Sequence, residues 1–307
     1  MTTAQAPAHA ATPPAAAARS PWLPRILLGN LVVEVLIVVT GGLVRLTGSG
    51  LGCPTWPQCV PGSFTPVPHQ AEGYHRFIEF GNRTLTGLVG FVALLVVYAV
   101  WRWAAARHDL LVPAFLVLGG VVVQAVLGGI TVRTGLNPLT VAAHFLVSMV
   151  LVGASAFLVF REPSPSGRRA LVVPQLVERL GWATCAVAAV VLALGTVVTG
   201  SGPHSGDADE PARFGLDPRS VSWLHADAVM LFVGLVVAVW LVARLTGATS
   251  MPARAWAGVF AVTVAQGVVG YTQYFTGLPW GVVLVHMLLA TLLVVALVRA
   301  MVSMRAT

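Results

Sequence analysis

The sequence predicts an all-α, polytopic membrane protein whose eight spanning helices form two tandem four-helix bundles. Three observations predict this fold class: an apolar composition, eight long apolar runs, and a repeat that relates the two halves of the chain. Of the 307 residues, 57% are hydrophobic and 9% are charged, whereas about a quarter of the residues in a soluble domain carry a charge. The composition therefore excludes an ordinary water-soluble globular protein.

Eight apolar runs are each long enough to cross a hydrocarbon layer about 30 Å thick, which takes roughly 20 residues of helix. The runs are 25–46, 76–101, 111–132, 140–160, 181–200, 222–244, 255–275 and 281–302. Residues 1–20, rich in Ala, Pro and Thr, are predicted to form a disordered cytoplasmic tail. The apolar run that follows this tail is too long for the core of a cleaved signal peptide.

The basic residues predict the orientation of the chain in the membrane. All 18 are arginines, and they are scattered through short loops instead of forming the tract expected of a nucleic-acid-binding protein. With the N-terminus in the cytoplasm, twelve of them fall on the cytoplasmic side and six on the outer side, which follows the positive-inside bias. We therefore expect a multi-pass protein of the plasma membrane, surrounded by lipid, with both termini in the cytoplasm and no nucleic acid as partner.

An internal repeat relates the first four spans to the last four. The motif TGSG closes the first span at 47–50 and the fifth at 199–202. The segment 124–144 aligns without gaps on 266–286, so that a Gln and a His coincide at its two ends. Because each half has an even number of spans, the copies have the same orientation, related by an axis along the membrane normal. The predicted parts are a first bundle at 21–161, a cytoplasmic linker at 162–179 and a second bundle at 180–307.

Four of the eight histidines stand at the outer beginnings of the even-numbered spans: His75, His144, His225 and His286. A single intramembrane histidine is about as often an interhelical hydrogen-bonding residue as a ligand, but four in a repeated pattern indicate function. Two neutral imidazoles facing each other in a four-helix bundle are suited to haem iron. A zinc or di-iron site would need three or more clustered ligands, which the helix sequences do not supply. We predict two haem sites, and the repeat favours pairing within each half over pairing between halves.

The halves diverge around the first histidine of each. Glu72 stands three residues before His75 and Glu79 four after it, so the three are expected to share one helical face. Arg76 and Arg83 join this cluster and are candidates for forked hydrogen bonds to haem propionates. The alternatives are that Glu72 complements a helix dipole and that the two arginines are interfacial anchors.

Cysteines and one further acid complete the candidate residues. Cys53 and Cys59 lie in the first outer loop, where oxidising conditions allow a disulfide, either as a structural staple or as a redox-active or loop-positioning pair. Cys185 lies within the fifth span and has no predicted partner. Glu34, midway along the first span, is a membrane-buried acid and hence a functional candidate, but the sequence assigns it no role.

Together these motifs resemble those of the haem A synthase family, which converts haem O to haem A for terminal oxidases. The resemblance covers residues 25–302. It rests on GGLVRLTGSGLGCPTWP, on Glu72-x-x-His75-Arg76 with GNRTLTG, on the two Gln…His blocks, and on GSGPHSGD with His225. It implies that a methyl group of haem O is oxidised to a formyl group by successive hydroxylations and loss of water.

The resemblance also implies roles for the four histidines and for Glu72. His75 and His144 would hold the substrate haem O in the first bundle, and His225 and His286 would be the axial ligands of a haem b cofactor in the second. Glu72 matches the family's acid beside the first histidine, and we expect it to assist proton transfer during methyl oxidation.

The cysteines match the family only in part. Cys53 and Cys59 correspond to the family's cysteine pair in the first loop. Some members carry a second pair between the fifth and sixth spans, which is absent from GSGPHSGDADEPARFGLDP. A mechanism that needs both pairs is therefore not expected for this chain.

The expected partners follow from the resemblance: haem O and haem A, a haem O synthase upstream, terminal oxidase assembly factors, and an unidentified electron acceptor. Two other functional classes are the alternatives. A di-haem, cytochrome b-like electron-transfer protein would bind two equivalent haems permanently and form no haem A. A transporter built from tandem bundles would leave the pattern of four histidines unexplained.

Overall fold

The computed structural model describes residues 20–164, 169–207, 212–247 and 249–306. Within these residues, eight helices are long and apolar enough to cross a membrane, so the predicted all-α, polytopic membrane fold is confirmed. The predicted tail lies outside the described residues except for Ser20. The helices are α1 (Trp22–Leu46), α2 (His75–Ala104), α3 (His108–Arg133), α4 (Pro138–Arg161), α5 (Gln175–Ser201), α6 (Pro218–Thr246), α7 (Ser250–Phe275) and α8 (Trp280–Ser303).

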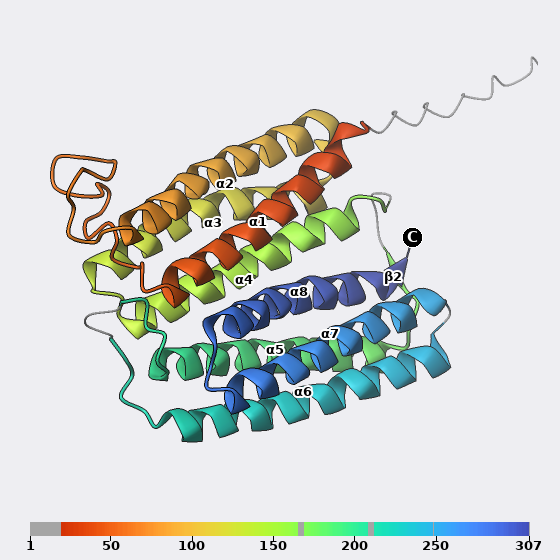
Figure 1. The fold of residues 1–307 in the computed structure, drawn as a ribbon. Coiled ribbons are helices and arrows are strands. Elements are labelled where there is room, and N and C mark those ends of the chain that lie inside the picture. The colour runs from red at the N-terminus through yellow and green to blue at the C-terminus, as the bar shows by residue number, and fades with distance from the viewer. Residues whose placement is uncertain (1–19, 165–168, 208–211, 248, 307) are drawn as a thin grey trace, which may run out of the picture.

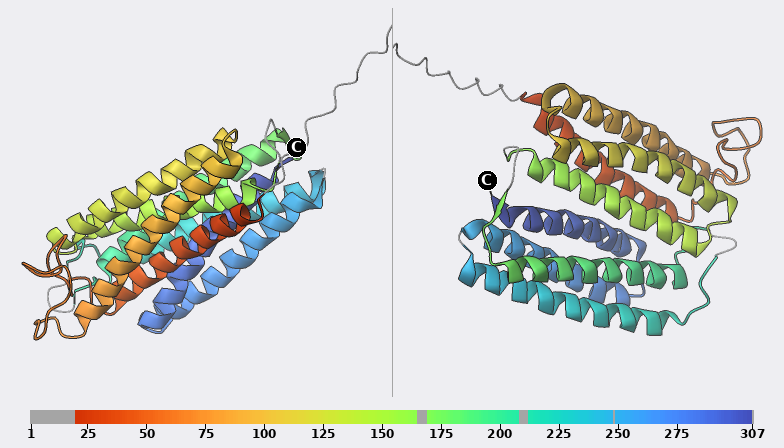
Figure 2. Two further views of the ribbon diagram at one scale, coloured as in Figure 1. Left: turned by 90° about the horizontal axis from the view of Figure 1, so that it is seen from above. Right: turned by 180° about the vertical axis from the view of Figure 1, so that it is seen from behind.

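The helices form two groups of four, α1–α4 and α5–α8, that lie one beside the other (Figures 1 and 2). Each group has a hydrophobic core of its own. The first core packs around Val96, Val100 and Val117, and the second around Phe232 and Trp256, all with almost no exposed surface. The start of α1 and the end of the chain lie at one end of the helices, and the loop between α1 and α2 lies at the other (Figure 1).

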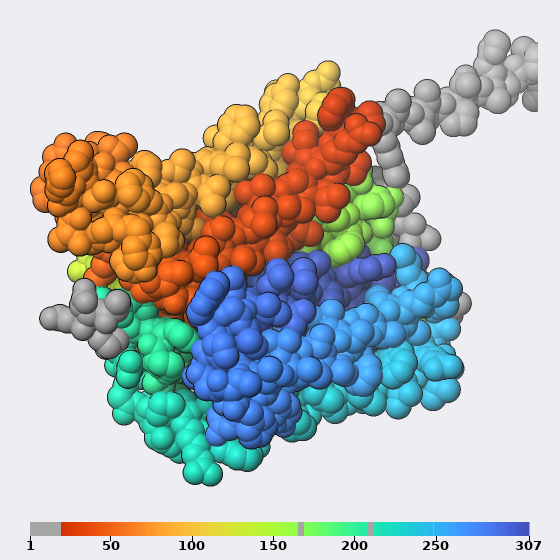
Figure 3. All heavy atoms as spheres, in the orientation of Figure 1, coloured from red at the N-terminus to blue at the C-terminus, as the bar shows by residue number. Residues whose placement is uncertain are grey.

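Helix α8 joins the two groups by packing against both α1 and α4. Figure 3 shows its contact with α1, where the blue and red surfaces meet. Gly42 of α1 makes this close approach possible. A Cβ atom at Gly42 would lie 2.9 Å from Cε and 3.0 Å from Sδ of Met287. Small residues allow the backbones of membrane helices to approach closely, so the interface depends on the missing side chain at this position.

Caps fix the beginnings of the two helices that carry His144 and His225. The side chain of Asn137 accepts a hydrogen bond from a backbone N–H at the start of α4, and Asp217 does the same at the start of α6, each before a proline. Hydrogen bonds from the side chain and backbone of Ser220 hold the pKa of Asp217 below its usual range. These caps set how far each histidine lies from the helix end.

Two features were not predicted from the sequence. A two-residue strand in the linker, β1 (Ala170–Leu171), pairs antiparallel with β2 (Arg305–Ala306) at the end of the chain. Arg305 also donates a hydrogen bond of 2.8 Å to Glu178 of α5. Helix α5 begins at Gln175, inside the predicted linker. The sequence did not predict this start because the first turns of α5 contain polar residues and do not belong to an apolar run. Strands of two residues carry no periodicity that a sequence could reveal.

The close contact at Gly42 generates a prediction about stability. The change Gly42→Leu should destabilise the protein by about 1–3 kcal/mol, because the added side chain must displace Met287 in a filled interface. The matched control is Gly41→Leu, since a Cβ atom at Gly41 meets nothing within 4 Å. Thermal unfolding in detergent, followed by circular dichroism, measures the difference, and equal stability of the two variants would contradict this account.

Candidate haem-binding site

The four candidate histidines lie near the beginnings of the even-numbered helices, at one end of the molecule. His75 is the first residue of α2, and the other three lie within the first turns of α4, α6 and α8. His225 and His286 both lie in the second bundle, on α6 and α8.

Three of these imidazoles face a glycine of the preceding helix. A Cβ atom built on each glycine would lie 3.2–3.4 Å from Cε1 of the imidazole. The Nδ1 atoms of the same three histidines are buried and have no hydrogen-bond partner among the described residues. The pairs are Gly128 with His144, Gly195 with His225, and Gly270 with His286.

This arrangement fits the binding of haem by two imidazoles. Buried polar atoms normally have a partner, so unpartnered ring nitrogens in a polytopic protein indicate groups reserved for something else. Glycine on the facing helix lets the imidazole pack closely against that helix. Among the described residues, no group of three or more His, Cys, Asp or Glu could hold a metal ion, and a haem held by two histidines needs no such group.

The repeated Gln…His segments have the same structure in both halves. The side-chain amide of Gln124 donates a hydrogen bond of 2.9 Å to the backbone carbonyl of His144. Gln266 donates one of 3.1 Å to the carbonyl of His286. Each bond ties an odd-numbered helix to the next helix beside the candidate ligand. The glutamines thus position the backbone that carries each histidine.

The environment of His75 differs from that of the other three. Its Nδ1 atom lies 2.8 Å from Oγ of Ser49, in the loop that follows α1. A Cβ atom at Gly52 of the same loop would lie 2.3 Å from the carbonyl oxygen of His75, so only glycine allows the loop to lie so close. The first outer loop therefore rests directly on the first turn of α2.

An ion pair on α2 holds the disulfide of this loop. The disulfide joins Cys53 and Cys59. Glu79 accepts a hydrogen bond of 2.6 Å from the backbone N–H of Cys53, and Arg83 donates one of 2.6 Å to the carbonyl of Cys53. Arg83 also donates to the carbonyl of Thr55 and forms a 2.5 Å ion pair with Glu79. We call Glu79 and Arg83 the loop clamp.

Glu72 does not lie on the predicted helical face. Helix α2 begins at His75, and Glu72 lies in the turn before it, where Gly73 has a φ of +55° that interrupts the helix. One carboxylate oxygen of Glu72, Oε2, is buried and has no hydrogen-bond partner among the described residues. The backbone N–H of His75 donates to the carbonyl of Glu72 at 3.1 Å, so the acid stays beside the candidate ligand.

The two candidate propionate contacts have different surroundings. Arg83 is engaged by the loop clamp. Arg76 donates a hydrogen bond of 3.3 Å to the carbonyl of Gln70, and its guanidinium lies 4.7 Å from the ring of Phe77. Its Nε atom is buried without a partner among the described residues. Arg76 thus retains a free donor, and the propionate role of both arginines stays a prediction.

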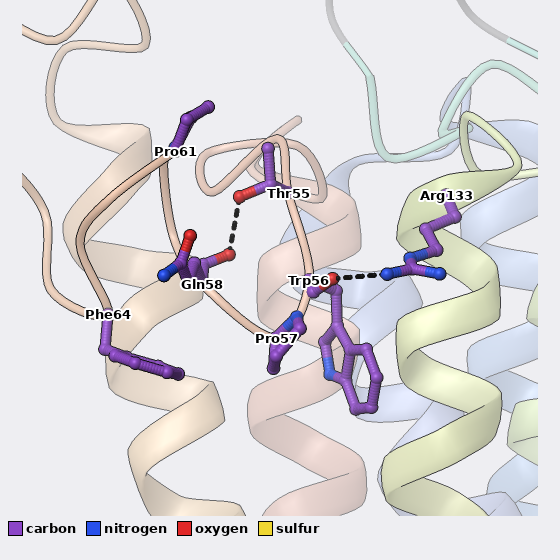
Figure 4. A pocket seen from close by; sticks show the side chains of 7 residues that line it. All are labelled: Thr55, Trp56, Pro57, Gln58, Pro61, Phe64 and Arg133. Carbon is purple, nitrogen blue, oxygen red and sulfur yellow. Dashed lines mark hydrogen bonds between the residues drawn. The ribbon is translucent and has the colours of Figure 1, made fainter.

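The outer loop and the end of α3 also line an open pocket of about 410 Å³ (Figure 4). The carbonyl of Trp56 accepts a 3.0 Å hydrogen bond from Arg133, and the indole of Trp56 packs on Gly129, where a Cβ atom would lie 2.5 Å from the ring. Gly129 is the neighbour of Gly128, which faces His144. The pocket is lined by Thr55, Trp56, Pro57, Gln58, Pro61, Phe64 and Arg133.

With this geometry in place, the comparison with known proteins is informative. The sequence profile of the COX15-CtaA family, described as cytochrome oxidase assembly protein, matches residues 24–204. The chain belongs to this family. The match covers the whole first bundle with its outer loop and the fifth helix.

Relatives within the family extend the likeness to the second bundle. The protein named heme A synthase from Alkalihalophilus pseudofirmus is 25% identical over 281 residues, which cover 86% of this chain and 91% of the relative. The heme A synthase of Lysinibacillus sphaericus is 27% identical over 279 residues, covering 84% and 87%. That of Shouchella clausii is 30% identical over 145 residues, covering 45% and 46%.

Three contacts of this family member were not found from its sequence. Ser49 belongs to the repeated TGSG motif, but the motif does not reveal that its side chain reaches His75. Glu79 and Arg83 have the spacing of a helical ion pair, but that spacing does not reveal that both bind the backbone of Cys53. Trp56 gave no signal, because its partner Gly129 lies on another helix.

The loop clamp generates a prediction about the disulfide. The change Arg83→Leu leaves the carboxylate of Glu79, which is 5% exposed, without its ion-pair partner. Removing one member of a buried pair costs about 3–5 kcal/mol, so the loop should detach from α2. We expect dithiothreitol to reduce Cys53–Cys59 at least about tenfold faster, as measured by alkylation and mass spectrometry.

The control for this measurement is Thr84→Val. Among the described residues, the hydroxyl of Thr84 bonds only to the carbonyl of Phe80 on the same helix, and Thr84 stands next to Arg83 in the sequence. An unchanged reduction rate in Arg83→Leu, or an equal increase in both variants, would show that the clamp does not hold the loop.

Proposed function

We propose that this chain is a haem A synthase, which oxidises a methyl group of haem O to the formyl group of haem A. The observation that carries the proposal is the likeness to relatives named heme A synthase over 84–86% of this chain, combined with histidines at equivalent places in both bundles. The proposed location is the plasma membrane, with both termini in the cytoplasm and the candidate site towards the outer face.

In this proposal the first bundle binds the substrate and the second binds the resident cofactor. His75 and His144 would bind the iron of haem O, and His225 and His286 would hold haem b. A haem b held by two histidines supplies one-electron redox chemistry when bound. The division is supported by the surroundings of His75, where a loop, a disulfide and a carboxylate gather. The described residues of the second bundle do not repeat this arrangement.

Glu72 is the proposed proton acceptor. Conversion of a methyl to a formyl group replaces two hydrogens by one oxygen, so protons and electrons leave the substrate together. The unpartnered Oε2 atom of Glu72 is available to take up a proton at the outer edge of the first bundle. The electrons pass to an acceptor outside this chain. The oxygen atom likewise comes from a source outside this chain.

The loop clamp and Trp56 have a supporting role in this proposal. Glu79 and Arg83 hold the disulfide loop over the start of α2, and the indole of Trp56 packs against α3 beside the residue that faces His144. A loop fixed in this way restricts the access of water to the first bundle.

Haem O is lipophilic enough to enter between helices from the bilayer. In this proposal a haem O synthase delivers it, and the product passes to terminal oxidase assembly factors.

Replacement of the four histidines tests the assignment of the two sites. Each of His75→Ala and His144→Ala should remove haem O from the purified protein and leave haem b, because only one bundle loses a ligand. The changes His225→Ala and His286→Ala should have the opposite effect. Pigment extraction and chromatography measure both haems, and His108→Ala, on the opposite end of the molecule, is the control. Loss of both haems in every variant, or of neither, would contradict the assignment.

Replacement of Glu72 tests the chemistry separately from binding. The change Glu72→Gln keeps the size of the side chain but removes the proton acceptor, so the formation of haem A should fall about hundredfold or more. Haem O and haem b should both be retained. The yield of haem A and of hydroxylated haem O measures the effect, and an unchanged yield with normal haem content would exclude this role.

A further inference from the structure

Ser49 gives His75 a side-chain hydrogen-bond partner, which the other three candidate ligands lack among the described residues. Oγ of Ser49 lies 2.8 Å from Nδ1 of His75, and Ser49 has no exposed surface. The Nδ1 atoms of His144, His225 and His286 have no partner among the described residues. A side-chain contact made by one of the four candidate ligands calls for a specific explanation.

The direction of this hydrogen bond follows from the hydrogens that are available. Oγ1 of Thr47 lies 2.8 Å from the carbonyl of Leu43 and 2.8 Å from Oγ of Ser49. A hydroxyl has one hydrogen and a carbonyl can only accept, so Thr47 donates to Leu43. Towards Ser49, Thr47 must therefore act as the acceptor, and Ser49 donates its only hydrogen to Thr47.

Oγ of Ser49 is consequently an acceptor on the side that faces His75. An acceptor opposite Nδ1 requires the proton on Nδ1, and the neutral ring then has its free lone pair on Nε2. The chain of donors runs from His75 through Ser49 and Thr47 to the carbonyl of Leu43. Partners of this kind fix the tautomer and orientation of a metal-binding imidazole.

The second copy of the TGSG motif does not form this chain. Oγ1 of Thr199 bonds to the carbonyl of Gly195 at 2.8 Å, as Thr47 does to its own helix. Oγ of Ser201, however, bonds to the carbonyl of Val197 at 2.9 Å, which is also on its own helix. The same four residues thus reach a histidine in the first half only.

We propose that Ser49, oriented by Thr47, is a positioning residue that holds His75 with the proton on Nδ1 and Nε2 ready to bind the iron of an exchanging haem. The inference rests on the proposed function, in which the first bundle takes up haem O and releases haem A. A ligand oriented before the haem arrives lowers the cost of binding. The resident haem of the second bundle binds once, so its ligands have less need of such a partner.

The test compares Ser49→Ala with Ser201→Ala in the full-length protein loaded with haem O and haem b. Transfer of each haem to an excess of an apo-globin is followed by absorbance, and extracted pigments identify which haem has moved. We expect Ser49→Ala to release haem O about tenfold faster, with haem b unchanged. Ser49→Thr, which keeps the hydroxyl, should restore slow release, and Ser201→Ala should resemble the original protein.

A second measurement reads the tautomer directly. Long-range proton–nitrogen NMR of the ¹⁵N-histidine-labelled, haem-depleted full chain should show the Nδ1–H form at His75, assigned by its absence in His75→Ala. Ser49→Ala should shift that signal towards the Nε2–H form, and Ser201→Ala should not. A purely structural role of Ser49 would leave the tautomer unchanged.

The outcomes separate this inference from the proposed function. Unchanged haem O release in Ser49→Ala, equal effects of Ser49→Ala and Ser201→Ala, or loss of both haems in Ser49→Ala would overturn the role of Ser49. In each of those cases the haem O and haem b of the original protein still support the synthase. If the original protein binds no haem O, or if His75→Ala retains it, the proposed function itself fails and the inference with it.

Discussion

The rest of the candidate site depends on the contact between the first outer loop and the first turn of α2. Gly52 lets the loop backbone reach the carbonyl of His75, Ser49 then meets the imidazole, and the loop clamp binds both the N–H and the carbonyl of Cys53. Close backbone approach is possible only because Gly52 has no Cβ atom. The disulfide constrains the loop through Cys53, whose backbone the loop clamp binds.

A duplicated scaffold explains what the two bundles share, and the loops explain how they differ. Each bundle uses a glutamine amide to fix the carbonyl of one histidine, and a glycine to let an imidazole pack closely against the preceding helix. Helix packing in a membrane depends on small residues and internal hydrogen bonds, so both devices are retained wherever the same packing is retained. The outer loops are free of that constraint. The ionisable residues and the disulfide that distinguish the first bundle accordingly gather around the loop that follows α1.

The sequence predicted the helices because lipid leaves few alternatives. Backbone groups in a bilayer must bond within the chain, so an apolar run of sufficient length is a helix. The repeat then indicated which helices are equivalent, and Gln124 and Gln266 have equivalent bonds. Loop contacts could not be predicted in this way. The periodicity of the sequence does not indicate that Ser49 reaches His75, or that Gly73 excludes Glu72 from α2. Both features depend on the path of a loop.

The path of that loop is set partly by the second bundle. At the outer end of α1, Arg45 donates hydrogen bonds to the carbonyls of Thr199 and His204, and the backbone N–H of Gly50 donates to the carbonyl of Gly206 at 2.9 Å. Thr199 lies in the last turn of α5, the counterpart of α1, and the loop beyond α5 carries His204 and Gly206. The segment that contains Ser49 is therefore held between α2 of its own bundle and the α5–α6 loop of the other. A displacement of that loop would move Ser49 relative to His75, which gives the second bundle a physical route to the ligand in the first.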